Sequence, residues 1–348
     1  MKKLLQVIAL TFLTFLCLFI IFLLWNKFPM LPAKFKVGII HLPDIKQNEP
    51  HGVIRVVTYN IQYGMGLEGR RTENLNTWDF YERLQKIADI LKEINADIVL
   101  LQEVDFHSRR SNNIDQSYFL ALKAEYPYIA KAPHWKIKFL PDFATHIGPL
   151  EHGLAVLSRY PLIDNESRVF KLPEEAPFYV RWLYSPHGGQ KTVAEIGSTN
   201  LTIINLHLEP WAQKTREKTT LKVIHWIEEL KGPIVVGGDF NAIPPEAPLK
   251  TYTNLEDTPW FIDKKQWDLE NDITINAFRK LPTFSAAISV EAYLKNEQES
   301  FTYPANHPTQ KLDYIFAGKG AEALKGYVFK KAGPASDHLP LVAEIRLQ

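Results

Sequence analysis

The chain has 348 residues, 46% of them hydrophobic and 23% charged, and its 40 basic and 39 acidic side chains leave a formal net charge of +1. Disordered chains have fewer apolar residues and more net charge, and general nucleic-acid binders are far more basic, so both classes are excluded. Cys17 is the one cysteine, which excludes a disulfide scaffold, and the length suits one large domain with an appendage or two average domains.

The chain begins with an apolar run without charge, residues 4–25, behind Lys2 and Lys3. As a helix these 22 residues span about 33 Å, enough to cross a hydrocarbon core of about 30 Å. The run is longer than the apolar part of a usual signal peptide, and no small-residue cleavage site follows it. We therefore favour an uncleaved, single-pass signal-anchor over residues 1–28, and a cleaved signal peptide is the alternative.

The charges beside this run bear on its orientation. Lys2 and Lys3 favour a cytoplasmic N-terminus, whereas Lys27, Lys34 and Lys36 oppose it. We predict the first orientation, which places the rest of the chain outside the cytoplasm. The first 28 residues hold three lysines and no acid, so the remaining residues carry a net charge of −2 rather than +1. Such a domain is not attracted to polyanions by its bulk charge.

The segment that follows, residues 29–52, contains Pro29, Pro32, Pro43 and Pro50 and is predicted to be a semi-extended linker. A single domain, residues 53–348, is expected beyond it.

Strands and amphipathic helices alternate in this domain. Apolar and β-branched runs predict strands at residues 53–59, 97–102, 153–157, 193–196, 201–206, 234–236, 311–316 and 341–345. Helical spacing of apolar residues predicts helices over 80–94 and 215–230, and the less periodic segment 244–304 is expected to hold a helix or two among loops. Hairpins mixed with strand–helix–strand units predict an α/β protein in which two packed mixed β-sheets are flanked by helices.

Polar side chains stand where these strands end. They are Asn60, Glu103, His207, Asp239 with Asn241, Asp313 within a strand, and Asp337 with His338 just before one. Side chains at the ends of strands of one core converge in space, as catalytic residues do. Each alone has an ordinary explanation as a turn acid, a cap or a half-buried histidine, although a carboxylate within a strand, such as Asp313, needs a partner.

Seven short motifs in this order resemble the endonuclease/exonuclease/phosphatase superfamily. They are T-Y-N-I (58–61), L-Q-E-V (101–104), G-L-A-V-L-S-R (153–159), N-L-H-L (205–208), G-D-F-N (238–241), L-D-Y-I-F (312–316) and S-D-H (336–338). The resemblance spans about residues 53–347 and implies a four-layered α/β sandwich. It also implies an enzyme that hydrolyses phosphoesters with Mg²⁺ or Mn²⁺, similar to apurinic endonucleases, pancreatic-type deoxyribonucleases and neutral sphingomyelinases.

The resemblance implies two groups of site residues. In the metal group, Glu103 binds the divalent ion, with Asn60 and Asp337 near it or on the phosphate. In the catalytic group, His338 is the general base oriented by Asp313, Asp239 positions the nucleophile or a second metal, Asn241 contacts the phosphate, and His207 stabilises the transition state or assists the leaving group. Some relatives pair the equivalent of His207 with a carboxylate, for which Glu151 is the candidate.

Elementary chemistry agrees with these roles. An anionic phosphodiester needs a cation to neutralise charge as water attacks, and an imidazole whose pKa is near neutral can take the proton of that water. A carboxylate on the other ring nitrogen fixes the tautomer of that imidazole.

The substrate is open between classes. A hydrolase of lipid-derived phosphodiesters is favoured by the anchor, by the near-neutral domain and by the aromatic residues Trp135, Phe139, Phe143, Trp182 and Trp211. These rings could equally be core.

Two alternatives remain beside the lipid hydrolase. A nuclease is supported by Lys131, Lys136 and Lys138 interleaved with His134 and Trp135. A non-catalytic, membrane-anchored binding module is opposed by the presence of every expected polar residue. No obligate protein partner is expected.

Overall fold

The computed structural model describes residues 2–28, 30–67, 76–140, 148–181, 184–248 and 258–348. Its strands are β1 (Lys34–Lys36), β2 (Ile39–His41), β3 (Val53–Asn60), β4 (Ile98–Asp105), β5 (Tyr128–Leu140), β6 (Gly148–Ser158), β7 (Leu162–Val169), β8 (Gly188–Ile196), β9 (Thr199–His207), β10 (Ile234–Asp239), β11 (Ser285–Ala286), β12 (Asp313–Gly318), β13 (Ala321–Val328) and β14 (Leu341–Leu347). Its α-helices are α1 (Lys2–Lys27), α2 (Thr77–Ile94), α3 (Gln116–Ala124), α4 (Gln213–Glu229), α5 (Thr274–Arg279) and α6 (Val290–Lys295).

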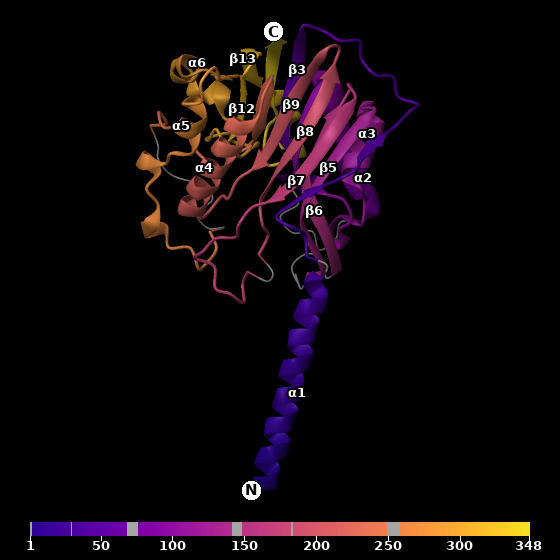
Figure 1. Cartoon of the computed structure of the whole chain (residues 1–348), viewed down its shortest axis with the longest axis vertical. Coiled ribbons are helices and arrows are strands. Elements are labelled where there is room, and N and C mark those ends of the chain that lie inside the picture. Colours follow the sequence, from indigo (N-terminus) through magenta and orange to yellow (C-terminus); the bar gives the residue numbers. More distant parts are fainter. Residues whose placement is uncertain (1, 29, 68–75, 141–147, 182–183, 249–257) are drawn as a thin grey trace.

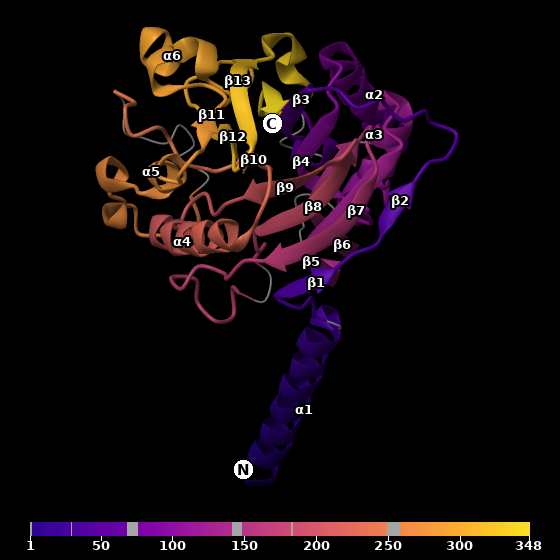
Figure 2. The same cartoon turned by 45° about the horizontal axis from the view of Figure 1, so that its top comes forward.

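The strands form two mixed sheets that pack face to face (Figures 1 and 2). One sheet has the order β1-β7-β8-β9-β10-β12-β11 and the other β13-β14-β3-β4-β6-β5-β2. Helices α2 and α3 pack on the outer face of the second sheet, and α4 and α5 on that of the first, each over its own apolar core. The predicted four-layered α/β sandwich is therefore confirmed.

Helix α2 shows how the sequence builds one of these layers. Its N-cap Asn76 accepts bonds from the backbone of Trp78 and Asp79, and the Asp79 carboxylate accepts one from the Asn76 backbone in return. This capping box starts the helix three residues before the predicted residue 80. The helix ends at Asn95, which adopts the left-handed conformation (φ 52°).

The expected linker is part of the fold. Strand β1 pairs with β7 at the edge of one sheet, and β2 pairs with β5 at the edge of the other. The ring of His41 stacks on that of Tyr128 with 4.6 Å between centroids. The described part of this segment, residues 30–52, thus covers two sheet edges whose backbone groups would otherwise be open.

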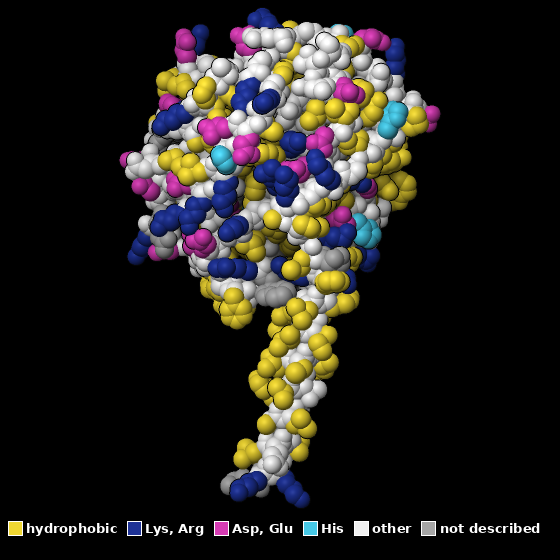
Figure 3. Space-filling view, viewed as in Figure 1, with side chains coloured by type: hydrophobic (Ala, Val, Ile, Leu, Met, Phe, Trp, Pro, Cys, Tyr) yellow, Lys and Arg dark blue, Asp and Glu magenta, His cyan; other side chains and the backbone are white. Residues whose placement is uncertain are grey.

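Helix α1 extends from the body of the molecule, and hydrophobic side chains cover it in Figure 3. Among the described helices it alone is long and apolar enough to cross a membrane, a test that an N-terminal signal sequence also passes. The C-terminal end of α1 is hydrogen-bonded to β5. Asn26 is buried and exchanges two hydrogen bonds with the backbone of Phe139 (2.8 and 2.6 Å), and the ring of Phe22 meets that of Phe139 edge-on.

A glycine lets the end of β10 lie close to β9. Gly238 has φ 146°, and a Cβ there would lie 1.9 Å from the carbonyl oxygen of Leu206. We expect Gly238→Ala to lower the free energy of unfolding by about 2–4 kcal/mol, because the backbone at the site must shift. Urea unfolding measures this. Gly38→Ala is the control, since a Cβ at Gly38 meets nothing within 4 Å, and an equal effect of both substitutions would contradict the prediction.

Candidate active site

The predicted polar residues meet at one end of the sandwich. Parallel strands β3 and β4 end there in the second sheet, and β9 and β10 end there in the first. Strand β12 starts at the same end, because it runs antiparallel to β10 with Asp313 opposite Asp239. Strand β14 runs antiparallel to β3, which brings the preceding Asp337 and His338 to this end as well.

A cavity of about 290 Å³ lies between these strand ends. Six predicted residues line it, namely Glu103, His207, Asp239, Asn241, Asp337 and His338. Asn60 and Asp313 lie directly behind them, bonded to lining residues.

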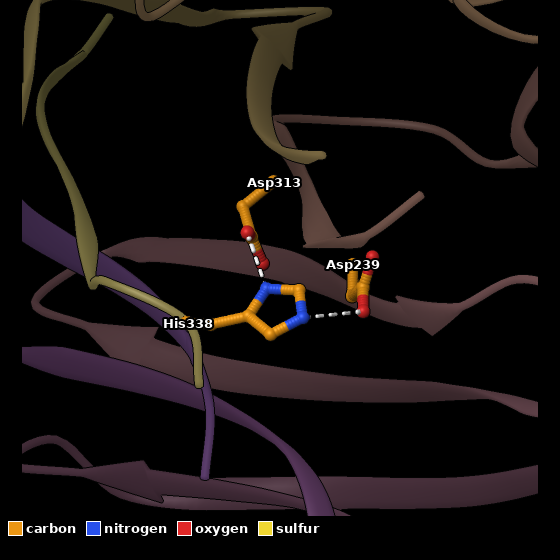
Figure 4. A group of neighbouring side chains, drawn as sticks. All are labelled: Asp239, Asp313 and His338. Atoms are coloured by element: carbon orange, nitrogen blue, oxygen red, sulfur yellow. Dashed lines mark hydrogen bonds and ion pairs between the residues drawn. The ribbon is translucent and has the colours of Figure 1, made fainter. Parts of the chain in front are cut away.

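His338 stands between two aspartates (Figure 4). Its Nδ1 is 2.8 Å from Oδ2 of Asp313, and its Nε2 is 3.6 Å from Oδ2 of Asp239. Burial alone lowers the pKa of His338, but the two carboxylates hold it well above its usual value. Asp313 is fully buried, and the Tyr303 ring lies 4.9 Å from the imidazole. With its pKa raised, the His338 ring can accept a proton at Nε2 only in its neutral form, whose tautomer Asp313 fixes.

Glu103 reaches the cavity because the strand that carries it is irregular. The register of β4 against β6 shifts between Leu101 and Val104, and Glu103 has φ 54°. The bulge lifts its carboxylate out of the ladder, as bulges near active sites often do.

Asn60 joins the two sheets at this point. Its Nδ2 donates to Oε1 of Glu103 (2.9 Å) and to Oδ2 of Asp239 (3.1 Å), while its Oδ1 accepts from the backbone of Gln62. In this structure Asn60 therefore faces the acids with its amide nitrogen, not with the oxygen that a metal ligand offers.

The site holds more negative charge than its own cations neutralise. Burial, and then Asp313, raise the pKa of Asp239 to about 7 in spite of His338. Burial and the nearby Glu103 raise the pKa of Asp337 to about 6. Ligand atoms of Asp239, Asp313 and His338 lie within 4.8 Å of one another. A cluster of acids with raised pKa values fits a hard divalent cation, which prefers carboxylate oxygens.

Within that cluster, Asp313 and His338 already form a pair. Their facing atoms already share a hydrogen bond, which leaves those two atoms unavailable to an ion. Glu103, Asp239 and Asp337 are the carboxylates that line the cavity outside this pair.

The suggested pairing of Glu151 with His207 is not what the structure shows. The carboxylate of Glu151 is 2.7 Å from the ammonium of Lys136, because the two residues lie opposite each other on β6 and β5. Nε2 of His207 instead lies 3.7 Å from Asp239 and 4.0 Å from Glu103.

The sequence reasoning missed several residues of the cavity wall, including Tyr63, His187 and Tyr303, whereas Trp211, which it weighed for substrate choice, does line the cavity. The ring of His187 stands perpendicular to that of His207 with 4.6 Å between centroids, and its Nδ1 is 3.3 Å from Glu209. Glu209 comes two residues after His207, and this spacing is the sequence signal that could have placed Glu209 near the site.

A second buried network supports the bulge of β4. Asp105 accepts two bonds of 2.9 Å from Arg110 and lies 2.9 Å from Nδ1 of His152. The guanidinium of Arg110 lies 3.8 Å from the ring centroid of Tyr63, on the cavity wall. Burial raises the pKa of Asp105, but Arg110 and His152 together bring it below its usual value.

The aromatic and basic residues weighed for substrate choice are now placed. Trp135 is buried and Phe139 is half-buried beside α1, while Phe143 and Trp182 lie outside the described residues. Each of the three lysines has a partner: Lys131 contacts Asp115, Lys136 contacts Glu151, and Lys138 lies 4.9 Å from the Trp25 ring centroid.

Comparisons with known proteins bear on the whole domain. The chain matches the model of the endonuclease/exonuclease/phosphatase family over residues 57–338. It is 25% identical over 309 residues to the uncharacterized protein YbhP of Escherichia coli (strain K12), which covers 84% of this chain and 96% of YbhP.

Two solved structures share the fold. An endonuclease/exonuclease/phosphatase from Beutenbergia cavernae DSM 12333 has a TM-score of 0.59 and 18% identity, over 85% of this chain and 72% of that one. A mannosyl-6-phosphatase from Bacteroides thetaiotaomicron VPI-5482 has a TM-score of 0.54 and 16% identity, over 84% and 99%.

Proposed function

The chain belongs to the endonuclease/exonuclease/phosphatase family, whose members hydrolyse phosphoester bonds and are typically metal-dependent. From this membership we propose that the protein is a membrane-anchored phosphodiesterase. The attacking water would be activated by His338. The observation that carries the proposal is the Asp313–His338 pair on the wall of an acidic cavity. A buried carboxylate–imidazole pair beside further carboxylates is what base-assisted, metal-dependent hydrolysis needs.

The residues divide the work as follows. Asp313 fixes the tautomer of His338, whose Nε2 takes the proton of the attacking water while Asp239, 3.6 Å away, orients that water. Asn241 lines the cavity and would contact a phosphate oxygen. Glu103 and Asp337 would hold Mg²⁺ or Mn²⁺, with Asn60 holding Glu103 against Asp239. The bound ion would neutralise charge on the phosphate.

We propose that α1 is an uncleaved anchor. Removal of residues 1–28 would break the two hydrogen bonds between Asn26 and Phe139 and the bond from Lys27 to the carbonyl of Arg181. A cleaved leader has no need of such contacts with the mature domain. The domain would lie outside the cytoplasm, in keeping with Lys2 and Lys3 at the free end of the helix.

We propose a lipid-derived phosphodiester as the substrate. The three lysines that supported a nuclease all have partners, which weakens that alternative. Arg181, whose carbonyl accepts a bond from Lys27, follows Phe178 and Tyr179, whose exposed fractions are 77% and 56%. Exposed aromatic residues beside a membrane-crossing helix are placed to enter the lipid interface.

The test is a panel of substrates with the full-length protein in detergent and Mg²⁺. Sphingomyelin, a phosphoinositide, plasmid DNA and bis(p-nitrophenyl) phosphate are compared. Hydrolysis of a lipid phosphodiester is the expected result. Cleavage of plasmid DNA without lipid turnover would overturn the lipid substrate, and turnover of none of the four would overturn the enzyme.

The exposed aromatic pair gives a separate prediction. The double variant Phe178→Ser/Tyr179→Ser should turn over a lipid diester in vesicles at least about 30-fold more slowly, since each ring contributes on the order of 1–3 kcal/mol to contact with lipid. Turnover of soluble bis(p-nitrophenyl) phosphate should not change. Trp78→Ser, an exposed aromatic on α2, is the matched control. Equal losses on both substrates would speak against membrane contact by this pair.

A further inference from the structure

Six acidic and imidazole side chains form a continuous row along the cavity. Their order is Asp313, His338, Asp239, His207, His187 and Glu209. The facing atoms lie 2.8 Å apart between Asp313 and His338, 3.6 Å between His338 and Asp239, and 3.7 Å between Asp239 and His207. The ring centroids of His207 and His187 lie 4.6 Å apart, and His187 lies 3.3 Å from Glu209. Each end of the row is therefore a histidine whose Nδ1 faces a buried carboxylate.

The pair at the far end is longer, with 3.3 Å between Nδ1 of His187 and Oε2 of Glu209, but its carboxylate is held in place by other groups. Glu209 is buried, and its Oε1 accepts bonds from the hydroxyl of Tyr184 (3.0 Å) and from the backbone of Trp211 (3.2 Å) and Ala212 (3.4 Å). Its Oε2 is left to face Nδ1 of His187. His187 lines the cavity, and Nε2 is the ring nitrogen that remains for a ligand there.

His207, which lies between the two pairs, is less suited to donate a proton. Its buried Nδ1 has no hydrogen-bond partner among the described residues, so no carboxylate positions this ring as Asp313 positions that of His338. Its Nε2 points to Asp239 and Glu103.

The geometry points to His187 as the general acid that protonates the leaving group, positioned by Glu209. This rests on the proposed function and adds its second proton-transfer residue. In an in-line displacement the attacking and leaving oxygens lie on opposite sides of phosphorus, so base and acid must stand at opposite ends of the substrate. The row provides one carboxylate–imidazole pair for each end.

The step balances as follows. Water gives a proton to Nε2 of His338 while its oxygen bonds to phosphorus. The bond from phosphorus to the ester oxygen breaks, and that oxygen takes the proton from Nε2 of His187 and leaves as an alcohol. The imidazolium of His338 and the neutral His187 then return to their starting states by exchanging one proton with solvent.

The test compares two diesters that differ in their need for a proton, with full-length protein in detergent and Mg²⁺. Diphenyl phosphate releases phenol, whose pKa is about 10 like that of tyrosine, whereas p-nitrophenolate leaves as a stable anion. We expect His187→Gln to lower kcat about 100-fold or more on diphenyl phosphate but less than about five-fold on bis(p-nitrophenyl) phosphate. Glu209→Gln should show the same selective loss to a smaller extent, and it serves as the second variant if His187→Gln fails to fold.

His225→Gln, a change at an exposed histidine on α4, is the matched control and should leave both rates unchanged. Thermal unfolding of each variant reports on folding. Equal losses on the two diesters, or no loss on either, would overturn the role of His187 while leaving the proposed phosphodiesterase in place. A wild-type protein inactive on both diesters would overturn the proposed function itself.

Discussion

Replacing His338 by alanine is expected to lower kcat for phosphodiester hydrolysis by about 10²–10⁴-fold, with a much smaller change in KM. The variant loses the group that accepts the proton of the attacking water, while the acids that hold the cation remain. Asp313→Asn should lose nearly as much, because an amide facing Nδ1 no longer selects the tautomer with a free Nε2. Steady-state kinetics on bis(p-nitrophenyl) phosphate measure both effects.

The double variant sharpens this prediction. If Asp313 acts through His338, then Asp313→Asn in the His338→Ala background should cost little more than His338→Ala alone, because the two losses are not independent. His51→Ala, an exposed histidine, is the control for the substitution itself. Full activity of His338→Ala would rule out the proposed base, and additive losses would mean that Asp313 serves some other group.

Much of this site could be predicted because its signals are local. Asn60, Glu103, His207 and Asp239 each follow an apolar run, and the run that predicts the strand also predicts where its polar end lies. Once the strands belong to two packed sheets, the convergence of their ends follows. The family resemblance then supplied the roles that position alone does not give.

The structural features that were not predicted from the sequence depend on strand register and on contacts between distant segments. The predicted strand at residues 97–102 ended before Glu103, whereas β4 continues through a bulge to Asp105. Strand β5 was missed, since Pro133 within it cannot donate to the ladder and marks an irregular register. The partner of Glu151 is Lys136, which the pairing of β5 with β6 decides.

The far end of the cavity was missed for the same reason. His187 lies just before β8 in a stretch rich in glycine, and nothing in its neighbours marks it as functional. Its role becomes visible when β8 pairs with β9, which sets Gly188 opposite His207 and brings Glu209 to the imidazole. A Cβ at Gly188 would lie 2.6 Å from Nδ1 of His134, so a glycine is required beside the side chain of His134.

Removal of the divalent ion is expected to abolish turnover, and Glu103→Gln should weaken binding of that ion by at least about 10–100-fold. The substitution keeps the size of the side chain and removes one negative charge from a cavity in which Asp239 and Asp337 already have raised pKa values. Binding of Mn²⁺, followed by electron paramagnetic resonance without substrate, measures this independently of catalysis.

The same binding measurement distinguishes between two possible sets of metal ligands in the acidic cluster. If Glu103 and Asp337 hold the ion, then Glu103→Gln should weaken Mn²⁺ binding far more than His338→Ala does, since the ring of His338 is committed to Asp313. If instead Asp239, Asp313 and His338 hold it, as their mutual distances within 4.8 Å would permit, the order of the two variants reverses. Glu322→Gln, at an exposed acid paired with Arg346, corrects for the loss of one charge from the protein as a whole. If His338→Ala weakens Mn²⁺ binding more than Glu103→Gln does, then His338 is a metal ligand and cannot act as the proposed general base.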